Sequence, residues 1–301
     1  MLSFIKKVLV FSLLMVTAFL LVKAYTIQYL PQNFYSVYAN KLKMLSAIKA
    51  QRKIVLIGGS SVGFGISAKQ IEHATGIKTI NMGQGAGLGL LDARDYILNN
   101  ITKNDIIIFS PEWAFYEKPS FTDAAVLDNF IHNNPEYGVI INRPTYVMQS
   151  ALSAIYSYEF NNAGKKDKMR ENLPPYVYNC INEYGDIISH CGLKRMWPKP
   201  YLINLKKFDL KKFLEAFSFV GNHNTLIVFP PTQQPLFKKY GADLQGVENT
   251  LRSHKLNVVN NVTDNVYPDS SFFDAEYHLT CEYRTIRTKN VINGIKKLLK
   301  Y

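Results

Sequence analysis

The chain has 301 residues, of which 47% are hydrophobic and 13% aromatic, a composition that supports a packed core and excludes wholesale disorder. Its 35 basic and 23 acidic residues give a formal net charge of +12. The lysines are scattered and no nucleic-acid-binding motif accompanies them, so we expect no nucleic-acid partner. Attraction to an anionic membrane surface or to an acidic glycan explains the charge as well.

The N-terminal segment predicts export or membrane anchoring. Lys6 and Lys7 precede an uncharged run from Val8 to Val22, which is shorter than the roughly 20 residues that span a bilayer comfortably. The helix can continue past Lys23, whose side chain can reach the interface. No clear small-residue cleavage site follows. We therefore interpret residues 1–25 as an uncleaved transmembrane signal anchor, with the rest of the chain in the periplasm or at the cell surface.

The remaining chain predicts an α/β fold. Residues 26–52 contain a turn and a helix and are interpreted as a stalk or lead-in to a domain over 53–301. Strands and helices then alternate, which is typical of a parallel sheet with helices on both faces. We expect strands over 53–58, 77–81, 105–109, 225–229 and 256–259, and helices near 67–75, 88–100, 208–219, 242–253 and 282–299.

Residues 111–205 interrupt this alternation and are interpreted as an inserted cap. The segment is rich in Tyr, Asn and Pro, with helical patterns near 122–131 and 143–154. Its aromatic residues are candidates either for stacking against sugar rings or for the core, namely Trp113, Tyr116, Tyr156, Tyr158 and Tyr178.

Three cysteines occur in the chain. Cys180 and Cys191 are close enough in sequence to bridge a small loop in an oxidising compartment, which would leave Cys281 free. Three buried thiols are the alternative. The cysteines lack paired short spacing and the six histidines are dispersed, so no metal site is predicted.

The first predicted strand ends in a turn that suits a nucleophile. The apolar run 53–57 leads directly into Gly58-Gly59-Ser60-Ser61, where the glycines permit a sharp turn and leave space around Ser60. Ligands of parallel sheets bind at the carboxyl ends of the strands. A serine hydroxyl becomes a strong nucleophile only beside a base. Ser61 is the rival nucleophile, and both serines could instead cap the following helix.

Several nucleotide and hydrolase motifs are excluded. After the second strand, a dinucleotide turn would need glycine at position 88 or 90, and both residues are leucines. No phosphate-binding G-x-x-x-x-G-K-[ST] motif occurs, and a G-x-S-x-G elbow around Ser60 would need glycine in place of Val62. We therefore expect no cofactor. The C-terminal segment FFDAEYHLT offers Asp274 and His278, and the order Ser, Asp, His is admissible because triads are recognised by geometry.

Four blocks together resemble the SGNH (GDSL-like) hydrolase superfamily over about residues 53–290. They are Gly58-Gly59-Ser60 after the first strand, Asn81-Met82-Gly83 after the second, Ser110-Pro111-Glu112-Trp113 after the third, and the segment from Asp274 to His278. The chain is most similar to the membrane-anchored branch linked to acylation or deacylation of bacterial surface polysaccharides. The resemblance implies a flavodoxin-like α/β/α sandwich.

The resemblance also assigns roles. Ser60 would be the nucleophile and His278 its base, Asp274 would orient His278, and the N–H groups of Ser60 and Gly83 would form the oxyanion site. Three positions depart from the family pattern. Gly59 replaces the usual Asp, Glu112 stands where an Asn is expected, and the Asp-His spacing is one residue longer. Glu276 or Asp269 could therefore be the acid, or the site could be a dyad, and Glu112 must be protonated, contact the substrate or be structural.

These observations predict an extracytoplasmic serine acyl esterase or O-acyltransferase that acts on a cell-surface polysaccharide or glycolipid. An acyltransferase would receive its acyl group from a partner protein in the inner membrane, as the resemblance implies. The alternative is a non-catalytic SGNH-like protein that binds polysaccharide or assists envelope assembly.

Overall fold

The structure is a computed structural model that describes residues 2–29, 34, 36–91, 94–120, 175–196, 205, 208–222 and 224–299. Its centre is a four-stranded parallel sheet in the order β2-β1-β3-β4. The strands are β1 (Lys53–Gly58), β2 (Lys78–Asn81), β3 (Ile106–Ser110) and β4 (Asn224–Ile227). This is the order of the first four strands in flavodoxin-like sheets. A parallel bridge between Ile227 and Val258 replaces the predicted strand over 256–259.

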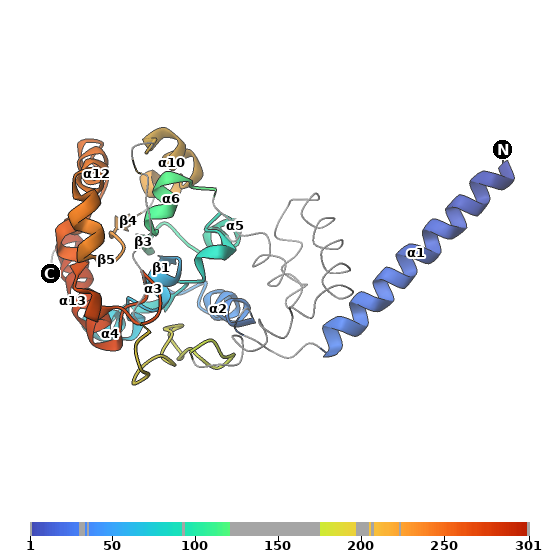
Figure 1. The fold of residues 1–301 in the computed structure, drawn as a ribbon, viewed down its shortest axis with the longest axis horizontal. Helices are drawn as coiled ribbons and strands as arrows, with labels where there is room; N and C mark the ends of the chain where they lie inside the picture. The colour runs from blue at the N-terminus through green and yellow to red at the C-terminus, as the bar shows by residue number, and fades with distance from the viewer. Residues whose placement is uncertain are drawn as a thin grey trace.

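Helices cover both faces of the sheet, as the alternation predicts (Figure 1). Successive residues of β1 point to opposite faces: Ile54 and Leu56 belong to one apolar cluster, and Val55 and Ile57 to the other. The first cluster includes residues of α4 (Ala68–Thr75) and α13 (Cys281–Leu299). The second includes residues of α2 (Ser36–Ala47), α5 (Arg94–Asn99), α6 (Trp113–Glu117), α10 (Leu210–Ala216) and α12 (Gln234–Ser253).

Element boundaries differ from prediction where glycine or proline obscures the pattern. Helix α4 agrees with prediction, beginning at the Ser67 cap and ending at Gly76, whose φ of 68° suits glycine. The predicted helix over 88–100 splits into a short 3-10 turn (Ala86–Leu88) and α5. Helix α12 begins at Gln234, well before the predicted position, because proline is tolerated in the first turn of a helix. Short α11 (Phe219–Asn222) follows α10, and two-residue strands β5 (Thr232–Gln233) and β6 (Val266–Tyr267) pair beside the main sheet.

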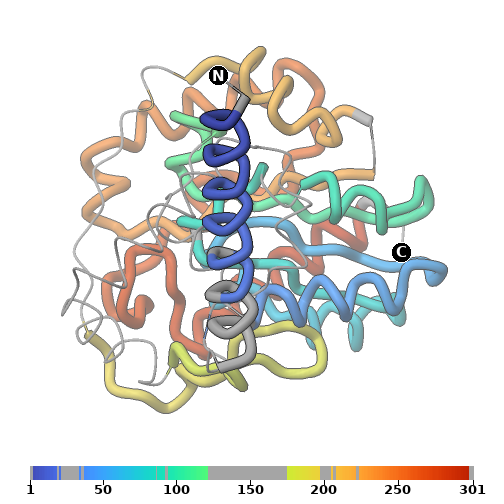
Figure 2. Tube along the Cα trace, turned by 90° about the vertical axis from the view of Figure 1, so that its right-hand side faces the viewer, coloured from blue at the N-terminus to red at the C-terminus, as the bar shows by residue number. Residues whose placement is uncertain are grey.

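The N-terminal segment forms two helices. Helix α1 (Leu2–Tyr29) extends away from the sheet in Figure 1 and stands nearest the viewer in Figure 2, and its side chains between residues 3 and 18 are exposed. Within the described residues, no helix combines the length and apolar character that a membrane span needs. Helix α2, in the predicted lead-in, packs Tyr38, Leu42 and Leu45 into the core. Helix α2 is therefore part of the α/β domain, although the predicted domain began at residue 53.

The predicted cap over 111–205 is described only in part. The predicted helices near 122–131 and 143–154, together with Tyr156 and Tyr158, lie outside the described residues. Trp113 and Tyr116 are fully buried in the apolar core, so the core alternative is confirmed for these two residues. Trp113 stacks on Phe229 and donates to Thr232 Oγ1 at 2.9 Å. Tyr178 is half-buried in a loop over 175–196.

The predicted Cys180–Cys191 disulfide is wrong. Cys191 instead bonds to Cys281, the first residue of α13, with a Cα–Cα distance of 5.5 Å. Cys180 is free and lies in an apolar cluster with Val37 and Phe64. Burial raises the pKa of its thiol to about 11. Proximity in sequence misled the prediction, because the 175–196 loop turns Cys180 inward and carries Cys191 out to α13.

Candidate functional site

The predicted site residues gather at the carboxyl ends of the parallel strands. Gly58 ends β1 and lies opposite Ser110, the end of β3. Ser60 begins α3 (Ser60–Gly63), a single helical turn. Its side chain is partly exposed, and among the described residues its hydroxyl has no hydrogen-bond partner. Ser61 is fully buried and its hydroxyl donates to Ser110 O at 3.3 Å. Of the two serines, the geometry favours Ser60 as the nucleophile.

Glu112 holds the turn on both sides of Ser60. Its carboxylate accepts the N–H of Gly59 at 3.1 Å and the N–H of Ser61 at 2.8 Å. A side chain at position 59 would collide with this carboxylate, which explains why this position holds glycine. Burial raises the pKa of Glu112 against the opposing effect of these hydrogen bonds. Of the three predicted roles for Glu112, the contacts support the structural one.

Arg287 braces the same turn from α13. Its guanidinium is fully buried and donates to Ser61 O at 2.6 Å, to Ser110 Oγ at 2.7 Å and to Phe229 O at 3.0 Å. Burial lowers its pKa to about 10, so it keeps its charge at neutral pH. The planar guanidinium therefore links the turn after β1, the end of β3 and the segment that follows β4.

The turn after β2, Asn81-Met82-Gly83, is held by the side chain of Asn81. Its side-chain amide donates to Val62 O at 3.1 Å and Ile66 O at 3.0 Å, and its oxygen accepts the Gly83 N–H at 2.9 Å. Gly83 packs so closely on Gly63 that a side chain at position 83 would collide with the Gly63 backbone. The predicted role of Gly83 as an oxyanion donor does not fit this geometry, because its N–H already has an acceptor.

Lys41 of α2 is a buried cation beside the turn that follows β2. Its ammonium donates to Gly83 O, and burial lowers its pKa to about 8. Lys41 was not predicted as a site residue, because it lies in a segment interpreted as a lead-in. Its contact places a charge next to the turn that follows β2.

Asp274 and His278 form a close pair at the tip of a loop. Asp274 Oδ1 lies 2.7 Å from His278 Nδ1, and both side chains are less than a tenth exposed. The two arms of the loop pair with each other. Phe273 N–H donates to His278 O at 2.7 Å, and Phe272 and Leu279 form an antiparallel β-bridge. This pairing brings Asp274 and His278 together across the residues between them. Asp274 is therefore the carboxylate that contacts His278, and the alternatives Glu276 and Asp269 make no recorded contact with it among the described residues.

A ring contact joins this pair to the turn that begins at Ser60. Phe64 follows Ser60 by one helical turn, and its N–H donates to Ser60 O at 2.9 Å. The Phe64 ring stacks on the His278 imidazole with centroids 4.0 Å apart and an interplanar angle of 9°. Asp274 engages His278 Nδ1, so Nε2 is the ring nitrogen that this carboxylate leaves available.

Electrostatics keep Asp274 ionised. Burial would raise the pKa of Asp274, but the hydrogen bond and charge of His278, together with the Tyr176 hydroxyl, bring the pKa below its ordinary value. The stability that these contacts give is present above the ordinary pKa of 3.8 and is lost as the pH falls through the lower folded-state pKa. The acid of the pair is therefore charged at neutral pH. Tyr176 and Phe64 are site residues that sequence reasoning missed.

Beside this pair lies a possible donor cluster for a metal. The ligand atoms of His190, Cys191 and Cys281 lie within 4.8 Å of one another. Both sulfurs belong to the disulfide, so neither is a thiolate that could bind a metal. His190 instead packs against Phe64, with centroids 4.9 Å apart, and its Nε2 lies 3.1 Å from Leu279 O.

His190 is expected to make stability fall in mild acid. Burial lowers the pKa of His190 from the ordinary 6.5 to about 4. Between these two pH values the imidazole is therefore protonated in the unfolded chain and neutral in the folded protein. We expect the free energy of unfolding to fall by about 2 kcal/mol between about pH 7.5 and about pH 5 from this residue. Urea unfolding of wild type and His190→Asn at both pH values measures it. An equal pH dependence in the two proteins would contradict the assignment.

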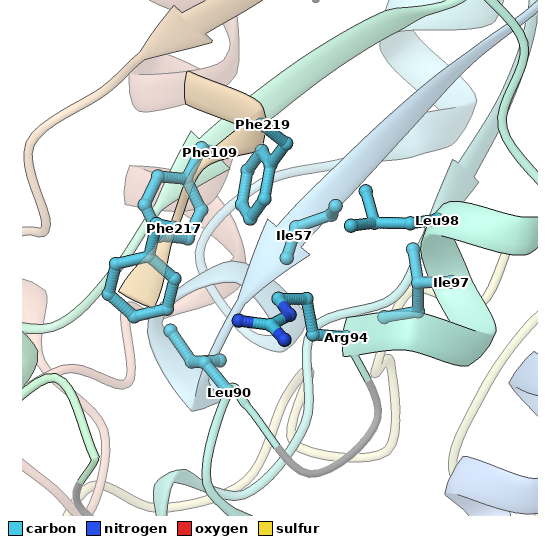
Figure 3. A pocket seen from close by; sticks show the side chains of 8 residues that line it. All are labelled: Ile57, Leu90, Arg94, Ile97, Leu98, Phe109, Phe217 and Phe219. Carbon is cyan, nitrogen blue, oxygen red and sulfur yellow. The ribbon is translucent and has the colours of Figure 1, made fainter. Parts of the chain in front are cut away.

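A small apolar pocket lies elsewhere on the sheet. Seven apolar side chains line it together with the Arg94 guanidinium, which lies among them (Figure 3): Ile57, Leu90, Ile97, Leu98, Phe109, Phe217 and Phe219. Arg94 Nη1 donates to Ala216 O at 2.7 Å. None of the residues that line it belongs to the set of Ser60, Asp274 and His278, so we do not assign it to the site.

Comparisons with models of known protein families, with curated proteins and with solved structures found no match for this chain.

Proposed function

We propose that the chain is a serine acyl esterase or O-acyltransferase of the SGNH type that acts on a cell-surface glycan outside the cytoplasm. One observation carries the proposal. A histidine oriented by a buried carboxylate at 2.7 Å stacks on Phe64, one helical turn after a serine whose partly exposed hydroxyl has no hydrogen-bond partner among the described residues. A serine, an oriented base and an acid are the groups that acyl transfer requires.

In the proposed reaction, His278 Nε2 accepts the Ser60 hydroxyl proton as Ser60 Oγ attacks an acyl carbonyl. The tetrahedral intermediate collapses to an acyl-serine, and His278 returns the proton to the leaving alcohol. Water then releases the acyl group in an esterase, and a sugar hydroxyl accepts it in a transferase. Asp274 stabilises the imidazolium that forms on the way.

The Ser60 N–H is the first proposed oxyanion donor. Glu112 engages the N–H groups on either side of it, at Gly59 and Ser61, and leaves that of Ser60 without a recorded acceptor among the described residues. The Gly83 N–H can contribute only if Asn81 releases it. A backbone donor held in advance costs no reorganisation as charge develops.

The proposed location rests on two features. The exposed apolar side chains of α1, together with Lys6 and Lys7 near its start, support a membrane-associated N-terminus. The Cys191–Cys281 disulfide supports an oxidising compartment. An acyl donor would then reach the protein through a membrane partner.

A second candidate function is favoured by Gly83. Because its N–H is bound to Asn81, the oxyanion site has only one ready donor among the described residues. A non-catalytic protein that binds polysaccharide or assists envelope assembly would tolerate this arrangement.

Product analysis tests the proposal and separates the two chemistries. The purified protein is incubated with p-nitrophenyl acetate, with and without an oligosaccharide acceptor. Free acetate at equal rates in both cases indicates an esterase, and acetyl esters on the sugar indicate a transferase. Oligosaccharide binding without any acyl transfer would support the non-catalytic candidate and overturn the proposal.

A further inference from the structure

The hydroxyl of Tyr176 lies beside the hydrogen bond between Asp274 and His278. It donates to Asp274 Oδ2 at 2.6 Å, whereas His278 Nδ1 lies 2.7 Å from the other oxygen, Oδ1. The same hydroxyl is 3.4 Å from His278 Nδ1. The two oxygens of one carboxylate therefore have different donors, and Tyr176 occupies the side that His278 does not use.

This contact matters because the Asp274 side chain is only 8% exposed. A buried carboxylate oxygen without a donor loses the water that would otherwise solvate it, and this loss is most unfavourable for a charged group. Without Tyr176, Asp274 would rotate toward solvent or take up a proton. Either change would weaken its hold on Nδ1 of His278, and the imidazole would lose its orientation and tautomer.

Ring contacts with neighbouring aromatic residues hold Tyr176 in this position. Its ring packs edge-on against Phe34, with centroids 5.1 Å apart, and lies against Phe64 at 6.2 Å. The residue stands at the start of the 175–196 loop, where Ser189 Oγ donates to Pro175 O at 2.6 Å. The disulfide ties the far end of this loop to Cys281, three residues after His278. The loop therefore brings the hydroxyl to the pair as a fixed group.

We infer that Tyr176 is a positioning residue, which holds the Asp274 carboxylate so that its Oδ1 keeps His278 oriented toward Ser60. The kinetic part of this inference rests on the proposed acyl-transfer function, and the carboxylate-orienting part does not. If the hydrogen bond served only to give the Tyr176 hydroxyl a partner, it would contribute to stability and its loss would leave the Asp274 titration unchanged.

Tyr176→Phe tests the inference, because it removes the hydroxyl and keeps the ring contacts. Tyr178→Phe is the matched control, a half-buried tyrosine two residues along the same loop. With p-nitrophenyl acetate we expect kcat/KM of Tyr176→Phe to fall roughly 10- to 100-fold, mainly in kcat. This is the usual loss when a hydrogen-bond partner that orients a reactive group is removed. We expect Tyr178→Phe to stay near wild type. Replacing Tyr176 by 3-fluorotyrosine keeps the donor and should restore activity.

A second readout does not depend on turnover. Carbon-13 NMR of the aspartate carboxyl groups follows the Asp274 titration, whose midpoint we expect to rise in Tyr176→Phe and to stay unchanged in Tyr178→Phe. Unchanged kcat/KM and an unchanged midpoint in folded Tyr176→Phe would overturn the inference. If wild type has no acyl-transfer activity, the proposed function fails alone, and a raised midpoint still supports the orienting role.

Discussion

Replacing Ser60 by alanine is expected to lower kcat/KM for p-nitrophenyl acetate by roughly 10⁴- to 10⁶-fold, as removal of the nucleophile does in serine hydrolases. The free energy of unfolding should stay within about 0.5 kcal/mol of wild type, the usual range for substitutions away from packed groups. The reason is that the Ser60 hydroxyl is partly exposed and has no partner among the described residues. Ester hydrolysis and urea unfolding of the same preparations measure both quantities.

Ser61→Ala is the matched control for this substitution. It removes the buried hydrogen bond to Ser110 O, so we expect a loss of about 1 kcal/mol in stability. Its activity should stay within a few-fold of wild type, because the Ser61 N–H that Glu112 holds is retained. The reverse outcome, in which Ser61→Ala is inactive and Ser60→Ala is active, would assign the nucleophile to Ser61.

Removing the disulfide is expected to produce the largest loss of stability. Cys191 and Cys281 are 90 residues apart in sequence, and a cross-link over that length restricts the unfolded chain by roughly 4–5 kcal/mol in the chain-entropy description. The double substitution Cys191→Ser, Cys281→Ser should lower the free energy of unfolding by an amount of this order. It should also lower activity, because the bond anchors the loop that carries Tyr176.

Reduction of the wild-type protein gives the complementary measurement. Dithiothreitol should destabilise wild type and leave the double variant unchanged. Cys180→Ala keeps the disulfide and should keep the response to dithiothreitol, since Cys180 is a free thiol. A Cys180→Ala protein that no longer responds to the reductant would contradict the assigned pairing.

The parallel sheet was predictable because its information is local. The strands are short apolar runs bounded by glycine or polar residues, and β1, β2 and β3 lie within a residue or two of the predicted positions. The position of Ser60 in a turn was predictable for a related reason, since a glycine pair after a buried strand marks a turn at the sheet edge. His278 and Asp274 were candidates by residue type and order, and their distance required the fold.

The supporting contacts depend on residues far apart in the sequence. The role of Glu112 could not be predicted, because only its contacts with the N–H groups of Gly59 and Ser61 show that it holds the turn and that the turn needs glycine at position 59. The pairing of Cys191 with Cys281 depends on how an irregular loop crosses to α13. Tyr176 lies in that same loop and has no pattern to distinguish it from the other 18 of the chain's 19 tyrosines.

Covalent labelling of Ser60 tests the central claim most directly. A fluorophosphonate phosphonylates a serine only when a neighbouring base makes its hydroxyl nucleophilic. The protein is treated with the reagent, digested and analysed by mass spectrometry, alongside His278→Ala. We predict one adduct on Ser60 in wild type and labelling at least about 100-fold slower in His278→Ala, in keeping with the usual contribution of a general base. No adduct on Ser60, or equal labelling of Ser60 in the two proteins, would contradict a nucleophile activated by His278.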